Sequence, residues 1–94
     1  MLSSHNDTEE LVEEDILTKE AELNTIILFN DDVNTFEWVI ECLMNYCGHD
    51  SVQAEQCAYI VHYTGKCGVK KGTLDTLKPI CSTLLQKGLS AEIN

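Results

Sequence analysis

The sequence predicts a two-layer α+β fold, in which a small three-stranded sheet packs against three helices in the order β-α-α-β-α-β. Two observations lead to this fold class. Short segments of strand character begin and end the region from residue 24 to residue 94, and three segments with apolar residues at helical spacing lie between them. Glycines follow the helical segments, as is typical of helix C-termini. A chain of 94 residues makes one domain at most, with a modest core.

The first 23 residues differ in composition from the rest of the chain. They hold eight acids and one lysine, which gives −7 of the total formal charge of −10; the acids are Asp7, Glu9, Glu10, Glu13, Glu14, Asp15, Glu20 and Glu22. Their aliphatic residues are scattered, so they are poor material for a core. We therefore expect a flexible acidic extension over residues 1 to 23 and a core domain over residues 24 to 94.

A strand and then a helix open the core domain. Residues 24 to 29 are rich in β-branched side chains, which is typical of a buried strand. Thr35 is a good N-cap, and apolar residues then recur at helical spacing until Gly48. We expect the first helix over residues 36 to 47.

A second helix and two short strands follow. Ser51 is expected to cap the second helix, and Gly65 to end it. Residues 66 to 70 lie between two glycines and are too few for a helix, so they predict a brief strand. Residues 89 to 93 predict the last strand.

The third helix has two candidate starts. Thr73 and Thr76 are both good N-caps. A start at Thr73 would place Pro79 well inside the helix, where proline costs roughly 3 kcal/mol or a kink. A start at Thr76 would place Pro79 in the first turn, where its missing N–H matters less.

Composition excludes several classes of function. The acidic surplus and the absence of arginine argue against partners that are nucleic acids or anionic membranes. The cysteines are odd in number and form no C-x-x-C pair; they are Cys42, Cys47, Cys57, Cys67 and Cys81. No signal peptide or membrane span is visible. We expect a cytoplasmic protein with reduced thiols and no cofactor.

Two polar features are expected to converge in this fold. Asn30, Asp31 and Asp32 follow the first strand directly, and His62 lies near the C-terminal end of the apolar second helix. An acceptor-rich rim beside an apolar wall suits a cation with N–H donors next to a greasy group, such as a peptide's α-ammonium and a bulky first side chain. The plainer alternatives are turn chemistry for the triplet and a packed or solvated histidine.

Several sequence blocks together resemble the ClpS family, adaptors of the Clp protease. The resemblance covers roughly residues 24 to 93. Its blocks are Ile27-Leu28-Phe29-Asn30-Asp31-Asp32, Phe36-Glu37-Trp38-Val39-Ile40-Glu41-Cys42-Leu43, Val61-His62-Tyr63-Thr64-Gly65-Lys66 and Cys67-Gly68-Val69. It implies a non-enzymatic adaptor that binds N-degron substrates, whose N-terminal residue is bulky and hydrophobic, and delivers them to a Clp AAA+ unfoldase.

The resemblance also implies a role for individual residues. The residues expected at the substrate's α-amine are Asn30, Asp31, Asp32 and His62. The residues expected around its first side chain are Asn34, Phe36, Val39, Ala58 and Val61. Lys78 matches a family lysine on the face that contacts the N-terminal domain of the unfoldase, and the acidic extension matches a segment used in delivery. No metal site is implied, and we expect a monomer.

Two departures from the family pattern fall in the expected pocket. Asn34-Thr35-Phe36 stands where many members have Thr-Pro-Met, and Ala58 stands where a Met is common. Replacing Met by Ala removes several heavy atoms from the wall, and the ring of Phe36 returns part of that volume. We therefore expect a reshaped pocket that tolerates Ile or Val.

Two rival functions remain open from the sequence. Cys42, Cys47 and His49 are conceivable zinc ligands, and Cys67 with His62 a conceivable nucleophile and base, although neither set has the paired spacing of a known zinc site. A generic interaction domain is the other rival, because the predicted layout is similar to that of the ribosomal stalk protein's C-terminal domain. A metal analysis of the purified protein tests the zinc or thiol site, and a peptide-binding assay tests the generic interaction domain.

The other aromatic and histidine residues show no functional pattern. Trp38 and Tyr46 are expected in or near the core because they share the apolar face of the first helix. His5 and His49 are expected at the surface.

Overall fold

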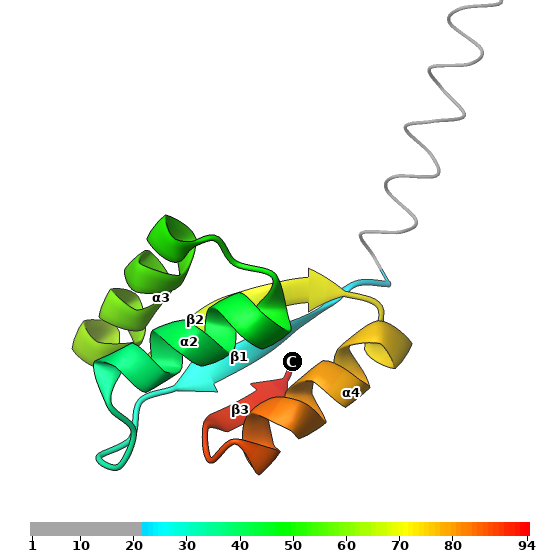
Figure 1. Ribbon diagram of the computed structural model, residues 1–94. Coiled ribbons are helices and arrows are strands. Elements are labelled where there is room, and N and C mark those ends of the chain that lie inside the picture. Colours follow the sequence, from blue (N-terminus) through cyan, green and yellow to red (C-terminus); the bar gives the residue numbers. More distant parts are fainter. Residues whose placement is uncertain (1–21) are drawn as a thin grey trace, which may run out of the picture.

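The structure of the protein, a computed structural model, describes residues 22–94. Its elements run in the order β1 (Asn24–Phe29), α2 (Phe36–Cys47), α3 (Ser51–Thr64), β2 (Lys66–Gly72), α4 (Leu74–Gln86) and β3 (Ser90–Ile93) (Figure 1). This order and the α+β class are those that the sequence predicts. The expected acidic extension lies outside the described residues, apart from Glu22 and Leu23.

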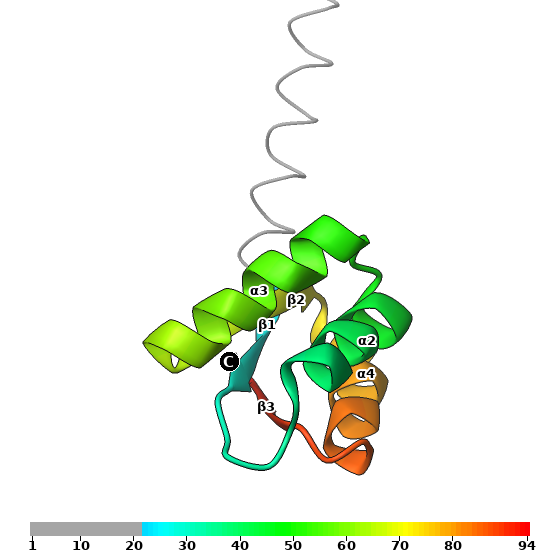
Figure 2. The ribbon, with the colours of Figure 1, turned by 60° about the vertical axis from the view of Figure 1, so that its left-hand side comes forward.

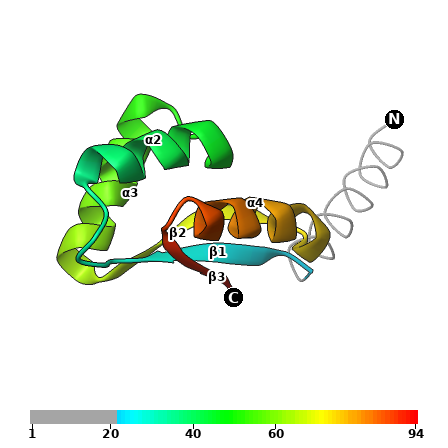
Figure 3. The ribbon, with the colours of Figure 1, turned by 60° about the horizontal axis from the view of Figure 1, so that its bottom comes forward.

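The strands form one antiparallel sheet in the order β2-β1-β3, so β1 is central. Helices α2 and α4 lie on the same side of this sheet (Figure 3). In β1, Ile26 and Leu28 are buried, and the other residues are only half-buried. The strand that was expected to be buried is therefore buried on one face, because an antiparallel sheet with helices on one side turns its other face to solvent.

The core lies between the sheet and the helices. Its buried members are Ile26, Leu28, Cys42, Leu43, Cys47, Ala54, Val61, Val69, Leu77, Cys81, Leu84 and Leu89. Trp38 and Tyr46 are partly buried against this cluster, as the sequence predicts. The indole Nε1 of Trp38 also donates a hydrogen bond to the carbonyl of Lys87 (3.1 Å), which joins α2 to the end of α4.

The first two helices begin with side-chain caps and end at glycines. Thr35 accepts a hydrogen bond from the Trp38 amide and Gly48 ends α2, as predicted. The predicted cap of α3 is wrong by one residue: Asp50 Oδ1 accepts from the Gln53 amide (2.7 Å), and Ser51 is the first helical residue. Asp is as good an N-cap as Ser, so residue type alone does not choose between neighbours.

The third helix of the domain, α4, begins after Thr73 and not after Thr76. The Thr73 hydroxyl accepts from the Thr76 amide (3.3 Å), which fixes the earlier start. Pro79 therefore lies inside the helix, in the position that sequence reasoning disfavoured. Proline has no N–H to donate to the carbonyl of Asp75, one turn earlier.

The second strand is longer than predicted and carries an irregularity. It runs to Gly72, and its register against β1 shifts between Ile26 and Ile27, so Val69 falls between the paired residues Gly68 and Lys70. Such a bulge leaves a residue out of the ladder. The last strand begins at Ser90, one residue later than expected.

The bulge at Val69 explains why the surface position expected for His49 is wrong. His49 is buried, with 6% of its surface exposed, and was expected at the surface. Its Nε2 lies 2.6 Å from the carbonyl oxygen of Val69 in the bulge. The histidine therefore satisfies a backbone acceptor that the strand ladder leaves free, a partner that local sequence does not reveal.

Candidate binding pocket between the end of β1 and α3

A half-open cavity of about 480 Å³ lies where the β1–α2 loop faces the C-terminal half of α3. Its lining residues are Asn30, Asp31, Asp32, Asn34, Phe36, Val39, Ala58, Val61, His62 and Tyr63. The structure thus brings together every residue that the sequence analysis placed at the α-amine or around the first side chain. The volume falls in the range of ordinary small-ligand sites.

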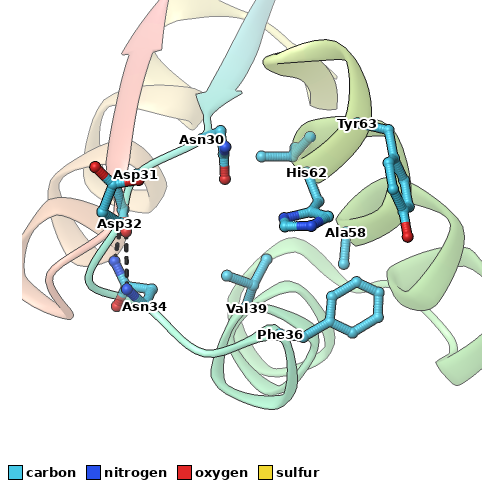
Figure 4. A pocket seen from close by; sticks show the side chains of 10 residues that line it. Asn30, Asp31, Asp32, Asn34, Phe36, Val39, Ala58, His62 and Tyr63 are labelled. Atoms are coloured by element: carbon cyan, nitrogen blue, oxygen red, sulfur yellow. Dashed lines mark hydrogen bonds between the residues drawn. The ribbon is translucent and has the colours of Figure 1, made fainter.

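The loop after β1 is tied to the end of α3. The Asn30 amide donates to the carbonyl of Gly65 (2.9 Å), and Gly65 ends α3 with φ +98°, a left-handed conformation that glycine adopts without strain. Figure 2 shows the end of β1 running beneath α3 before the loop turns to α2. Figure 4 shows the side chains of Asn30 and His62 projecting into the same space, one from the end of β1 and the other from α3.

Asp31 organises the loop. Its Oδ1 accepts hydrogen bonds from the amides of Val33 (2.9 Å) and Asn34 (2.8 Å), and its Oδ2 accepts from Asn34 Nδ2 (2.7 Å). Burial acts to raise the pKa of this carboxyl, but these hydrogen bonds outweigh burial and hold the pKa below its ordinary value. Asp31 therefore stays ionised and supplies negative charge at the rim, next to the exposed Asp32.

Asn34 fastens the loop to a distant turn. Besides Asp31, its Nδ2 donates to the carbonyl of Gly88 (2.8 Å), which follows α4. Both amide hydrogens of Asn34 are thus used within the protein. A bond that spans 54 residues of sequence is not visible in any local pattern.

The floor and one wall of the cavity are apolar. Ala58 and Val61 are buried on the inner face of α3, and Val39 and Phe36 are partly buried on α2. The ring of Phe36 packs edge-on against Tyr59, with the ring centroids 4.8 Å apart. This surface suits an aliphatic or aromatic side chain.

Sequence reasoning missed one lining residue, Tyr63. It lies next to His62, and the two rings meet edge-on with centroids 4.8 Å apart. Its position beside the expected histidine was the available signal, although its exposure of 74% is unusual for a tyrosine. Lys78, the expected unfoldase contact, is exposed on α4 and does not line the cavity.

The structure gives the cysteines packing roles. All five are free thiols, and Cys42, Cys47 and Cys81 are buried. Burial raises the pKa of Cys47 and of Cys57 to about 11, so these thiols stay protonated at neutral pH. The Cys67 thiol lies 3.4 Å from the carbonyl oxygen of Gly68.

Neither metal ligands nor a membrane span emerge from the described part of the chain. Within residues 22–94, no three His, Cys, Asp or Glu side chains come together as they would around a metal ion. His49, one of the conceivable zinc ligands, uses its Nε2 at the Val69 carbonyl. None of the helices in this range has the length and apolar character needed to cross a bilayer.

The fold and the cavity define a small α+β domain with an apolar site and an acceptor-rich rim. Comparison with known sequences then identifies its family. The model of the family described as "ATP-dependent Clp protease adaptor protein ClpS" matches residues 19–92, and the chain belongs to the ClpS family.

Individual relatives agree with this family. The chain is 39% identical over 67 residues to the ATP-dependent Clp protease adapter protein ClpS of Salmonella arizonae and, over the same length, to that of Escherichia coli O127:H6. Each match covers 67% of this chain and 63% of the relative, so it spans slightly less than two thirds of the relatives' length. The solved structure of Agrobacterium tumefaciens ClpS2 bound to L-phenylalaninamide superposes with a TM-score of 0.74 at 18% identity, covering 78% of this chain and 95% of that one.

Proposed function

We propose that this protein is an adaptor that binds N-degron substrates and delivers them to a Clp AAA+ unfoldase and its protease. The substrates are proteins with a bulky hydrophobic or aromatic first residue and a free α-amine. One observation carries the proposal: Asn30 and His62 project into the same space at the rim of a cavity whose floor is apolar. An ammonium group and a hydrophobic side chain on the same carbon atom match the polar rim and the apolar floor of the cavity.

The rim would hold the α-ammonium through acceptors. Asn30 offers a carbonyl oxygen, and the neutral imidazole of His62 offers a ring nitrogen. Asp31 already accepts its hydrogen bonds from the loop, so its role is to hold the loop and to place negative charge nearby. Asp32 is exposed beside it and adds to that charge.

The first side chain of the substrate would enter the apolar part of the cavity. Phe36, Val39, Ala58 and Val61 surround this space, and Asn34 is held at its edge by Asp31 and Gly88. Support comes from the ligand in the A. tumefaciens ClpS2 structure, since L-phenylalaninamide is the amide of an aromatic amino acid and has a free α-amine. The role is recognition, and no step of covalent chemistry is needed.

Both halves of the degron contribute to affinity. Burial of a Leu or Phe side chain is worth roughly 1.5 to 3 kcal/mol, and a hydrogen bond to a charged group is worth roughly 1.5 to 3 kcal/mol. N-acetylation removes the charge and two of the donors while it leaves the side chain unchanged. We therefore expect acetylation to weaken binding by about 30-fold or more.

The binding test compares labelled peptides that begin with Leu, Phe, N-acetyl-Leu or Ala, by fluorescence anisotropy. Micromolar or tighter binding of the Leu and Phe peptides, lost on acetylation, is the expected result. His62→Ala should abolish it, and Gln53→Ala, at an exposed position in the first turn of α3, is the matched control. Equal binding of the free and acetylated peptides would contradict the α-amine site and favour a generic interaction domain.

The same series tests the preference of the reshaped pocket. Phe36 and Ala58 both line the cavity, where many family members have two methionines. We expect peptides that begin with Ile or Val to bind more tightly than the Ala-starting control. Ile binding no better than Ala would contradict this preference without affecting the Leu and Phe results.

Delivery involves other parts of the molecule. We expect Lys78 on α4 to contact the N-terminal domain of the unfoldase, and the acidic residues 1 to 23 to take part in handing over the substrate. The adaptor would act as a monomer in the cytoplasm, without a nucleic-acid or membrane partner. Lys78→Glu should abolish degradation of a Leu-starting reporter by the unfoldase and protease while peptide binding remains. Lys71→Glu, at an exposed residue of β2, is the matched charge reversal, and equal loss in both variants would contradict a specific role for Lys78.

A further inference from the structure

A row of aromatic rings borders the cavity, with one ring from α2 and two from α3. Phe36 lines the cavity and meets Tyr59 at 4.8 Å between centroids. Tyr59 and Tyr63 lie one helical turn apart and stack, with centroids 5.8 Å apart and planes within 9° of parallel. The rings of Phe36, Tyr59 and Tyr63 are called the aromatic row below.

The aromatic row is exposed although it is apolar in character. Tyr59 is 47% exposed and Tyr63 is 74% exposed, and both lie outside the buried core. Two stacked tyrosines offer a flat π surface of the kind on which a planar cation stacks. Because Phe36 and Tyr63 also line the cavity, the row is continuous with the proposed degron site.

The segment that carries the row is acidic, although Lys66 follows three residues after Tyr63. From Asn30 to Gly65, the segment that builds the loop, α2 and α3, there are six acids and neither lysine nor arginine; the acids are Asp31, Asp32, Glu37, Glu41, Asp50 and Glu55. Glu55 lies one turn before Tyr59 on the same helix face. Lysines resume at Lys66 and occur on the β2 and α4 side of the domain. An occupant of the row is therefore favoured if it is cationic.

The geometry of a bound degron selects one side chain for the row. The amine points to Asn30 and His62 and the first side chain points into the cavity, so the carbonyl leaves on the opposite side of the α-carbon. In an extended peptide, alternate side chains share a face and are about 7 Å apart. The third side chain of the substrate would then face the protein again, on the same side as the first.

We propose that the aromatic row is a second subsite, which takes an arginine side chain at the third residue of the substrate. This inference rests on the proposed function. Arginine suits the site better than lysine because its guanidinium is planar, stacks on aromatic rings and is less strongly hydrated. The subsite selects among degrons that share the same first residue.

The test measures the affinities of four peptides that differ only after the leading Leu: Leu-Ala-Arg, Leu-Ala-Lys, Leu-Ala-Ala and Leu-Arg-Ala. A cation–π contact at an exposed site predicts that Leu-Ala-Arg binds about threefold tighter than Leu-Ala-Ala, with the lysine peptide between them. Arginine at the second position should give a smaller gain in affinity, since the second side chain of an extended peptide points away from the protein. Tyr59→Leu and Tyr63→Leu should bring the ratio of Leu-Ala-Arg to Leu-Ala-Ala close to one, and Gln53→Ala should keep it.

The outcomes separate this inference from the proposed function. If Leu-Ala-Ala itself fails to bind, the degron pocket is wrong. If it binds and Leu-Ala-Arg gives no gain, or if the gain persists in both tyrosine variants, the pocket stands and the second subsite is overturned. A gain that is equal for Arg and Lys and for both positions indicates general attraction to the acidic surface, which also overturns the subsite.

Discussion

The side-chain amide of Asn34 donates to the carboxylate of Asp31 at 2.7 Å and, with its other hydrogen, to the carbonyl of Gly88 at 2.8 Å. The same carboxylate accepts two backbone amides of the loop. The pair therefore fixes both the shape of the β1–α2 loop and its distance from the turn after α4. Asn30, which precedes Asp31, is tied separately to the end of α3 by the bond from its amide to the carbonyl of Gly65.

Removal of the Asn34 amide should loosen the loop. Asn34→Ala deletes one hydrogen bond to a charged group and one to a carbonyl, and we expect a loss of about 2 kcal/mol in the free energy of unfolding. Affinity for a Leu-starting peptide should fall as well, because Asn34 lines the cavity and the loop around it is no longer tied to Gly88. Urea unfolding and peptide titration measure the two effects. Val33→Ala, at the 87% exposed tip of the loop, is the control, and an equal effect there would contradict the role of Asn34.

The ionisation of Asp31 should make part of the stability pH-dependent. Its pKa is lowered in the folded protein, so the contribution is fully present above the ordinary carboxyl value of 3.8 and is lost as the pH falls through the lower folded value. Wild type should be more stable than Asp31→Asn at about pH 6, and this difference should shrink as the pH falls below 3.8. Unfolding midpoints of the two proteins, with Asp32→Asn as control, provide the check. A difference that does not change with pH would show that the carboxylate charge is not involved.

The two described histidines should respond to substitution in opposite ways. His49→Ala empties a buried site and leaves the Val69 carbonyl unpaired, and we expect a loss of about 2 to 4 kcal/mol in stability. His62→Ala removes an exposed side chain and should change stability by no more than about 0.5 kcal/mol. Peptide binding by the folded protein should show the reverse pattern, lost in His62→Ala and kept in His49→Ala. Thermal unfolding measures the stability of both variants, and fluorescence anisotropy measures their peptide binding. Binding that is lost in His49→Ala and kept in His62→Ala would contradict the roles given to the two histidines.

Pro79 lies inside α4 and removes one backbone N–H donor from the helix. Pro79→Ala restores an N–H that can reach the carbonyl of Asp75 and removes the clash of the ring with that turn, at the cost of a more flexible unfolded chain. We expect a gain of about 1 to 2 kcal/mol in stability, measured by urea unfolding. Ser82→Ala, at another exposed position of the same helix, is the control. A loss of stability would contradict a destabilising effect of the proline inside the helix.

Much of the fold was predictable because local signals agree with the tertiary structure. The bounds of β1 and α2, the Thr35 cap and the glycines that end α2 and α3 all follow from period, propensity and capping. The errors lie where two local choices are nearly equal. Asp50 and Ser51 are comparable caps for α3. For α4, Thr73 and Thr76 were both candidate caps; Pro79 favoured a start at Thr76, whereas the helix begins after Thr73.

The candidate site divides in the same way. The residues expected around the α-amine and the first side chain all line the cavity, because they sit at the strand end and on the helix face that this topology brings together. The bond from Asn34 to Gly88 and the exposed stack of Tyr59 and Tyr63 were not foreseen. They depend on the positions of neighbouring elements, which no spacing within one segment encodes.

By itself, the sequence determined the order of elements, the family and all the residues at the cavity except Tyr63, since these follow from short-range periodicity and from blocks that keep their residue types. Only the tertiary structure decided what each polar group contacts. It turned the carboxylate of Asp31 into the loop, buried His49 against the bulge at Val69 and stacked the rings of Tyr59 and Tyr63 beside the cavity. The physical reason is that a hydrogen-bonding group takes the partner that packing brings within about 3 Å, and packing is set by the whole chain.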